Sequence, residues 1–287
     1  MPPQSQLPRI ALLAALLCGG WWIALKFLPK PALAETNYEA NRLREERWLL
    51  GPKAPAALVG TSISGRLLPD YFEGTPLAGL ANLGLDGASP HTGLRLAAMR
   101  PDAVPLVLLE VQKLSMLPGP NDRQLLDLAS GVGLRVSEWL PLTRAEARPS
   151  TVLYAWLKER REGGGSGADP ATPRSETSTN AAAEPPLDWR PRIRAAIDAV
   201  QQSGARVILV RLPAGRANPA DPELPNEADA TAREFGLPLV DLLRLSRKEG
   251  LSMTYTDGLH LTPPSARAVS QLLVRALQAE GLLPERR

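Results

Sequence analysis

The hydrophobic pattern separates an apolar start from a longer segment in which short apolar runs alternate with amphipathic ones. Residues 10–25 (IALLAALLCGGWWIAL) carry no charge. Extended to residue 28, this run reaches about 19 residues, close to the ~20 that a helix needs to cross a bilayer. It is long for the apolar part of a signal peptide, which favours a membrane anchor, but Ala32-Leu33-Ala34 before Glu35 is also a possible cleavage site. Both interpretations place the rest of the chain outside the cytoplasm.

Beyond residue 35 the pattern predicts alternating strands and helices. Strands are expected at 56–59, 80–85, 104–111 (VPLVLLEV), 206–212 (RVILVRL) and 237–240, because these are short apolar runs rich in β-branched residues or leucine. Helices are expected at 35–50, 92–99, 122–128, 151–161, 190–202, 228–235 and 265–280. Residues 162–186 are rich in Gly, Ser, Thr, Ala and Pro and lack any apolar periodicity, which is typical of a flexible insertion.

This alternation predicts an α/β fold with three layers, in which helices cover both faces of a parallel sheet. The strands are apolar throughout, as expected for a sheet that is buried on both faces. We therefore expect a short tail at 1–9, a transmembrane or signal segment at 10–28, and one α/β domain at 35–287 that contains the insertion at 162–186.

Composition narrows the chemistry that this domain can carry. The net charge is +3, from 33 basic and 30 acidic residues, which does not point to a nucleic-acid partner. A single cysteine excludes a disulfide framework, and with two histidines it supplies a metal site poorly. No cofactor-binding motif is found, so we expect neither a metal nor a cofactor.

In a parallel sheet, chemistry gathers in the loops at the carboxyl ends of the strands. The first strand is followed by Gly60-Thr61-Ser62, a small-residue turn that can present a serine hydroxyl or simply cap a helix. The second strand is followed by Gly87, whose main-chain N–H no side chain would block. Near the end of the chain, Asp257 and His260 lie in one loop, where the carboxylate can orient the imidazole as a base.

Together, GTS (60–62), NLGLDGAS (82–89) and DGLHLT (257–262) resemble the ordered sequence blocks of the SGNH/GDSL hydrolase family. The resemblance covers about residues 56–283 and implies a flavodoxin-like SGNH fold. It also implies that Ser62 is the nucleophile, His260 the base and Asp257 its partner, and that Gly87 is an oxyanion-hole donor.

Two positions depart from the family pattern. Thr61 stands where the family often has Asp before the serine. The asparagine that follows the third strand in the family is missing, and Gln112 is the nearest amide that could replace it as oxyanion donor. A literal GPND occurs at 119–122, but Asn121 lies well past the strand end, and the segment reads better as a turn and helix cap. For His91, the alternative histidine, we expect a surface or first-turn role at a helix start.

The resemblance implies a serine-dependent acyl-ester hydrolase or O-acyltransferase, fixed at the cell membrane by a single span with its catalytic domain in the periplasm, or secreted if the first segment is cleaved. The expected substrate is an acyl ester, such as an acetyl ester of a surface polysaccharide or another envelope ester. The missing asparagine after the third strand, together with Thr61, supports an alternative, a catalytically degenerate module that binds a glycan or an envelope partner. An unrelated flavodoxin-like binding domain would need a phosphate-binding loop, and no such motif is present.

Overall fold

The computed structural model describes residues 6–28, 36–101, 104–163, 188–215 and 227–283. Its centre is a five-stranded parallel sheet with the order β2-β1-β3-β4-β5. This 2-1-3-4-5 order is one of the two common orders of doubly wound α/β sheets. The strands are β1 (Ala57–Thr61), β2 (Ala81–Leu85), β3 (Leu106–Glu110), β4 (Arg206–Arg211) and β5 (Leu239–Asp241).

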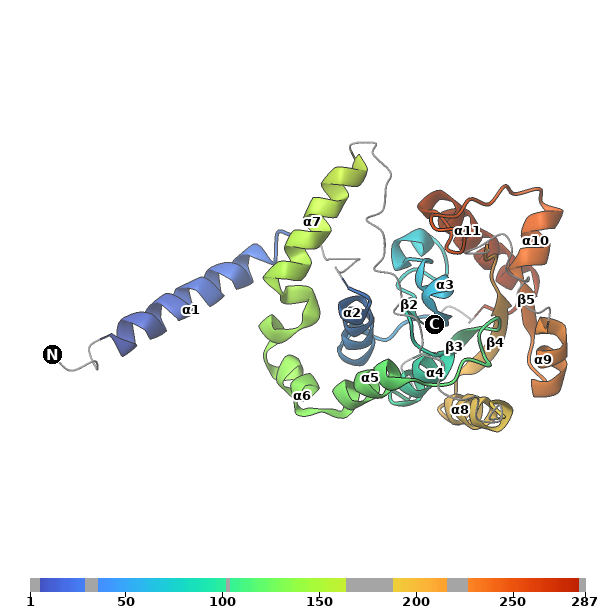
Figure 1. The fold of residues 1–287 in the computed structure, drawn as a ribbon, viewed down its shortest axis with the longest axis horizontal. Coiled ribbons are helices and arrows are strands. Elements are labelled where there is room, and N and C mark those ends of the chain that lie inside the picture. Colours follow the sequence, from blue (N-terminus) through green and yellow to red (C-terminus); the bar gives the residue numbers. More distant parts are fainter. Residues whose placement is uncertain (1–5, 29–35, 102–103, 164–187, 216–226, 284–287) are drawn as a thin grey trace, which may run out of the picture.

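Helices cover both faces of the sheet, as Figure 1 shows. Alternate residues of each strand point to opposite faces, so Val59 joins one apolar cluster and Leu58 the other. One cluster packs under α4 (Pro90–Ala98), α5 (Pro120–Ser130), α8 (Arg190–Gln202) and α9 (Ala228–Phe235). The other packs under α3 (Ser62–Gly65), η2 (Pro69–Phe72), α10 (Leu242–Lys248) and α11 (Pro263–Ala279).

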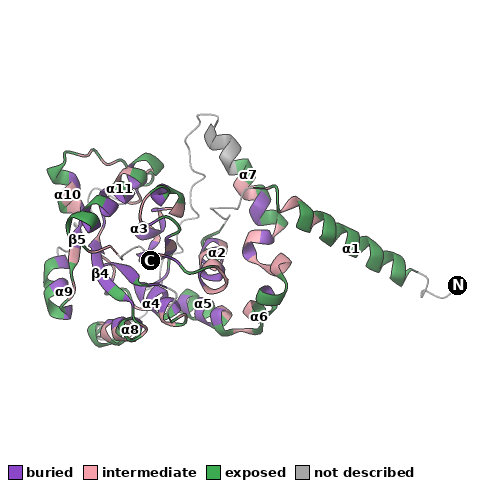
Figure 2. Ribbon diagram, turned by 180° about the vertical axis from the view of Figure 1, so that it is seen from behind, coloured by how far each residue is buried: buried purple, intermediate pink, exposed green. Residues whose placement is uncertain are grey.

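The helix α2 (Asn37–Leu50) lies along the outer edge of the sheet, next to β2. After α5 the chain forms α6 (Val132–Trp139), the short turns η3 (Pro141–Thr143) and η4 (Ala145–Ala147), and α7 (Pro149–Gly163). Figure 2 shows that the buried residues gather in the sheet and the helix faces that cover it.

The apolar helix α1 (Leu7–Ala24) projects away from the domain (Figure 1). Its mean hydropathy is 1.6 and none of its residues is buried, so its length and composition suit a membrane span or a signal sequence. The helix begins three residues before the predicted segment 10–28 and gives way to turns after Ala24. Pro8 at its first turn explains the early start, because proline fits the first positions of a helix.

All five predicted strands are confirmed, with ends displaced by at most two residues. Two helices were missed. α10 follows β5 without a loop, because Asp241 ends the strand and also caps the helix by accepting a hydrogen bond from the Arg244 N–H (2.8 Å). α6 follows α5 across a single residue, Gly131. The predicted insertion at 162–186 overlaps the end of α7 at its first two residues, and the remainder lies outside the described residues.

Candidate functional site

The turn that carries Ser62 begins at the carboxyl end of β1. Thr61 is the last residue of the strand and also the N-cap of α3, and its Oγ1 accepts from the Ile63 N–H (3.4 Å). Ser62 is therefore the first residue of a helix, a position whose N–H has no intrahelical acceptor. The fold thus places a partly exposed hydroxyl and a main-chain donor together at the edge of the sheet.

The structure brings Ser62, His260 and Asp257 into one hydrogen-bonded series, although Ser62 is 198 residues from His260 in the sequence. His260 Nε2 lies 2.8 Å from Ser62 Oγ. His260 Nδ1 lies 2.6 Å from Asp257 Oδ2. With Nδ1 protonated, the imidazole donates to Asp257 and leaves Nε2 free to accept the serine proton.

The Asp257 carboxylate is stabilised in its charged form. Burial by itself would raise the pKa of Asp257, but hydrogen bonds from the N–H and imidazole of His260 and from the Leu259 N–H outweigh this and lower it to about 2. The two main-chain bonds to Asp257 Oδ1 measure 2.8 Å from His260 and 3.0 Å from Leu259. Asp257 is therefore ionised at neutral pH, as an orienting partner for the imidazole must be.

The loop around His260 is closed by its own main chain. Tyr255 and Leu261 form an antiparallel bridge, and the Thr256 N–H donates to the His260 carbonyl (2.9 Å). The segment after β4 packs directly on this loop, where the Gly215 N–H donates to the Leu259 carbonyl (3.1 Å). A side chain at Gly215 would collide with the Gly258 carbonyl, so glycine permits this close approach.

Glu110 lies beneath the Ser62 turn, and the sequence predicted no role for it. Its side chain is fully buried and accepts from the Thr61 N–H (2.9 Å), the Thr61 hydroxyl (3.0 Å) and the Ser64 N–H (3.2 Å). Burial raises the pKa of Glu110, while the hydrogen bonds from Thr61 and Ser64 lower it in part. A charged residue inside the apolar run VPLVLLEV was the available signal, because buried carboxylates require partners.

Glu110 also explains two small residues in the turn. A Cβ at Gly60 would occupy the space of the Glu110 side chain, so only glycine fits there. Thr61 donates to the Glu110 carboxylate, whereas an aspartate at this position would face it with a like charge. Thr61, in place of an aspartate, therefore suits the Glu110 carboxylate below it.

The second loop is fixed by α2. Asn41 Nδ2 donates to the Asp86 carbonyl (2.8 Å) and Asn41 Oδ1 accepts from the Asp86 N–H (2.7 Å). Arg44 donates to the Gly84 carbonyl and forms an ion pair with Asp86 (3.2 Å). Gly87 follows with a φ of +68°, a conformation that favours glycine, and no described residue accepts its N–H. The contacts from α2 thus hold this loop in place, and the Gly87 N–H remains available as a donor.

Gln112 does not present its amide to the triad in the way that the missing family asparagine requires. Its Nε2 donates to the Leu212 carbonyl, and its Oε1 accepts from the Leu212 N–H (3.1 Å). The side chain therefore ties the end of β3 to the residue that follows β4. These bonds use the amide oxygen and one amide proton, so the contacts present support a structural role for Gln112 rather than a role as oxyanion donor.

The interpretation of the GPND segment as a helix cap is confirmed. Gly119 caps α5, and its N–H donates to Asp122 Oδ2 (2.7 Å), while Asn121 is exposed. Asp122 is buried and also accepts from the Ser89 N–H (2.8 Å), which links this cap to the second loop.

His91 occupies the first turn of α4 as expected, but the expectation of a surface position was wrong, since the residue is 4% exposed. Burial lowers the pKa of His91, and its buried Nε2 has no hydrogen-bond partner among the described residues. A histidine after Ser-Pro does not indicate, from the sequence alone, that α5 and the segment before it cover the first turn of α4.

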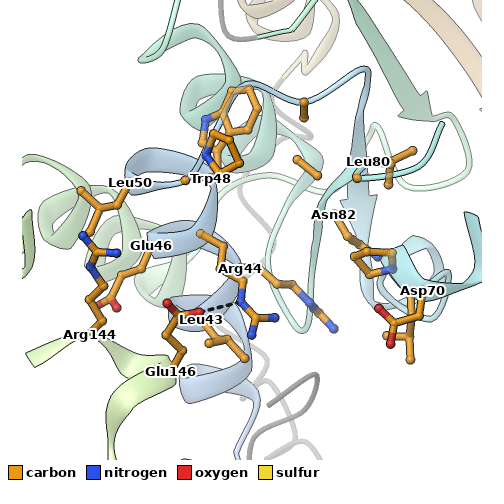
Figure 3. Close-up of a pocket in the computed structure, with 18 of the residues that line it drawn as sticks. Leu43, Arg44, Glu46, Trp48, Leu50, Asp70, Leu80, Asn82, Arg144 and Glu146 are labelled. Atoms are coloured by element: carbon orange, nitrogen blue, oxygen red, sulfur yellow. Dashed lines mark hydrogen bonds and ion pairs between the residues drawn. The ribbon is translucent and has the colours of Figure 1, made fainter. Parts of the chain in front are cut away.

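A cavity of about 700 Å³ lies on another part of the domain, between α2, η2 and the edge of β2 (Figure 3). Its lining includes Arg44, Trp48, Asp70, Asn82 and Glu146 and none of the three triad residues. Asn82 lines the cavity and also donates to the Leu67 carbonyl (2.8 Å) behind the serine turn. The cavity therefore adjoins Asn82, which supports the serine turn, but it does not include the triad.

Among the described residues, no group of three or more His, Cys, Asp or Glu side chains is arranged to hold a metal ion. No protein-family profile matches this chain, and no curated protein matches it. The functional interpretation therefore depends on the geometry of Ser62, His260 and Asp257.

Proposed function

We propose that the protein is a serine-dependent enzyme that cleaves or transfers an acyl group at an ester bond. The observation that carries this proposal is the series Ser62 Oγ, His260 Nε2, Asp257, with 2.8 Å and 2.6 Å separations. A serine hydroxyl is a weak nucleophile until a base removes its proton, and an oriented imidazole is the usual base.

In the proposed reaction, Ser62 Oγ attacks the ester carbonyl while its proton moves to His260 Nε2. The C–O bond of the leaving alcohol then breaks, and the alkoxide takes the proton back from Nε2. Asp257 stabilises the imidazolium between these two steps. In the second half, water or the hydroxyl of an acceptor loses its proton to His260 and attacks the acyl-serine. The bond between the acyl carbon and Ser62 Oγ then breaks, and Oγ takes the proton back from His260 Nε2.

The developing negative charge on the carbonyl oxygen needs donors. The N–H groups of Ser62 and Gly87 are the two candidates that lie at strand ends, since one begins a helix and the other has no acceptor among the described residues. Gln112 is not retained as the third donor, because its contacts fix it to Leu212.

The exposure of the triad bears on the substrate that it can receive. Asp257 is 41% exposed and the His260 side chain 13%, so the triad lies open at the surface. We infer an acetyl ester of a surface polysaccharide or another envelope ester, with α1 as a single-span anchor and the α/β domain on the extracytoplasmic side. Hydrolase and O-acyltransferase share the same acyl-serine intermediate and differ in the second acceptor.

The test is covalent labelling of the full chain in mild detergent with a fluorophosphonate probe, together with hydrolysis of p-nitrophenyl acetate. We expect wild type to react with the probe and to turn over the ester. Ser62→Ala should lose the label and roughly 10⁶-fold in rate, as when the nucleophile of another serine hydrolase is removed. Ser252→Ala, at an exposed serine, is the matched control and should behave as wild type.

Failure of wild type to label, with the fold intact by circular dichroism, would refute the enzyme and favour the degenerate binding module. That module is the second candidate, and the observation that favours it is the commitment of Gln112 to Leu212, which leaves the site without a third side-chain donor. Binding of acetylated polysaccharide without ester cleavage would support it.

A further inference from the structure

The exposed large apolar side chains outside α1 gather on two neighbouring helices. On α6 and the residue after it, the exposed fractions are 75% for Val132, 43% for Val136, 87% for Trp139 and 51% for Leu140. On α7 they are 55% for Leu153, 36% for Trp156 and 47% for Leu157. Elsewhere in the described part of the domain, such side chains are isolated: Tyr38, Met99 and Met116.

The spacing places these residues on one face of each helix. Val132, Val136 and Trp139 are separated by four and three residues, and Leu153, Trp156 and Leu157 by three and one, so each set projects from one side. The opposite sides contact the protein, since Ser137 on α6 and Thr151 on α7 are buried. Both helices are therefore amphipathic with their apolar faces turned outward.

These two faces lie at the end of α1 that meets the domain. The indole N–H of Trp21, three residues before the end of α1, donates to the Ala147 carbonyl (2.7 Å). Ala147 belongs to η4, the turn between α6 and α7. Figure 1 shows α6 and α7 along the side of the domain from which α1 projects. The apolar faces thus lie on the side of the domain where the apolar helix α1 joins it.

We propose that the outward faces of α6 and α7 lie in the head-group region of the same bilayer that α1 crosses. Helices that lie in this region combine a large apolar face with tryptophan and basic residues. Tryptophan prefers the membrane–water interface, where its ring is buried and its N–H stays hydrated. Arg135, exposed on α6, and Arg148, just before α7, supply cations for anionic lipid head groups. The bilayer is the occupant that also accounts for the adjacency of α1.

The single cysteine of the chain, Cys18 in α1, allows a clean depth measurement. An environment-sensitive fluorophore is attached either to Cys18 or, in a Cys18→Ser background, to Val136→Cys, Leu153→Cys or Gln202→Cys. Gln202 is exposed at the end of α8 and serves as the control. The full chain is reconstituted in lipid nanodiscs of phosphatidylcholine and phosphatidylglycerol that contain nitroxide-labelled lipids, with the nitroxide either shallow or deep in the acyl chain.

We expect the probe on Cys18 to be quenched most by the deep nitroxide and the probes at 136 and 153 most by the shallow one, about twofold or more above position 202. Quenching at 136 and 153 equal to that at 202, with Cys18 still inserted, would overturn the proposal. So would protection of both sites without lipid quenching in a sample whose mass shows a second copy, because the face would then be a dimer contact. An uninserted Cys18 would remove the shared bilayer and overturn it as well.

Discussion

The two segments that form the candidate triad are held in different ways. The serine turn is fixed by side chains from distant segments: Glu110 on β3 holds Thr61 and Ser64, and Asn82 on β2 holds the Leu67 carbonyl. The loop of Asp257 and His260 is held mainly by bonds among its own residues, 254–262. The position of Ser62 thus depends on the core of the sheet, whereas His260 and Asp257 form a local unit.

This difference predicts two kinds of variant. Changes in the histidine loop should remove activity with little loss of stability, because Asp257 is exposed and its partners are nearby in the sequence. Changes beneath the serine turn should reduce activity and stability together, because they leave buried main-chain donors without acceptors. The predictions below assume the proposed ester chemistry and test that contrast.

Among the variants that test this contrast, the largest effect is expected for Asp257→Asn. The amide cannot hold the imidazole in the tautomer that leaves Nε2 unprotonated, and the equivalent loss in a serine protease costs about 10⁴-fold in kcat. Since the pKa of Asp257 is lowered to about 2, the wild-type carboxylate stays ionised from pH 4 upward and sets no limit on activity there. We expect KM to change little and the urea midpoint to fall less than in Glu110→Ala, because the carboxylate that the fold stabilises is 41% exposed and solvent screens it. A large loss of stability in this variant would contradict the independence of the histidine loop.

The second prediction concerns Glu110. Glu110→Ala leaves the buried N–H groups of Thr61 and Ser64 unpaired, at about 1–3 kcal/mol each. A displacement of the turn of the order of 1 Å lowers kcat by roughly 10²-fold. Urea unfolding and steady-state kinetics on the same sample should both report the loss.

Glu110→Gln separates positioning from charge. Its amide oxygen can accept from both N–H groups and its NH2 can donate to the Thr61 hydroxyl, so the variant should recover most of kcat and stability. If the glutamine variant were as impaired as the alanine variant, Glu110 would act through its charge and not as the positioning residue that the contacts describe.

The contrast between the two segments also explains what the sequence could predict. Asp257 and His260 lie three residues apart, and Ser62 follows Gly60 after a predicted strand, so local pattern and sheet topology placed each at the carboxyl edge of the sheet. The resemblance to the SGNH/GDSL blocks then joined them into one predicted site. Glu110, Asn82 and Arg44 act through contacts 15 to 49 residues away, and no local pattern encodes such a pairing. The bonds of Gln112 could not be predicted for the same reason, since its partner Leu212 is 100 residues distant.

The outward faces of α6 and α7 are a second feature that the sequence alone does not predict. Their apolar spacing is readable in the sequence as a buried helix face, because periodicity reports amphipathicity and not what the apolar face contacts. Only the arrangement of the chain shows that these faces point away from the sheet. The place of the segment after α5 in the fold, and not its composition, therefore shows that its apolar faces are exposed.

A second buried carboxylate, Glu45, sharpens the comparison because it is buried like Glu110 but lacks its partners. It is 1% exposed on α2, between Asn41 and Trp48, which hydrogen-bond to the Asp86 and Leu96 carbonyls (2.8 and 2.7 Å). Its Oε2 has no hydrogen-bond partner among the described residues. Burial, together with repulsion from Glu46, raises the pKa of Glu45 to about 8 from its ordinary 4.5.

The smallest effect on the reaction is expected for Glu45→Gln, which should leave kcat unchanged and stabilise the domain above neutral pH. Below pH 4.5 the carboxyl is protonated in the folded and the unfolded chain, so burial carries no ionisation penalty. As the pH rises from 4.5 to 8, the unfolded chain loses this proton while the folded chain keeps it, and the free energy of unfolding falls. At ~1.4 kcal/mol per pKa unit, the shift of Glu45 from 4.5 to about 8 predicts that the glutamine variant gains about 5 kcal/mol at pH 8.5 and much less at pH 5. Urea unfolding at the two pH values measures this, with Glu39→Gln at a partly exposed position of the same helix as the control. An equal gain at both pH values would show that ionisation of Glu45 is not the cause, and a loss of kcat would show that α2 supports the reaction through this residue.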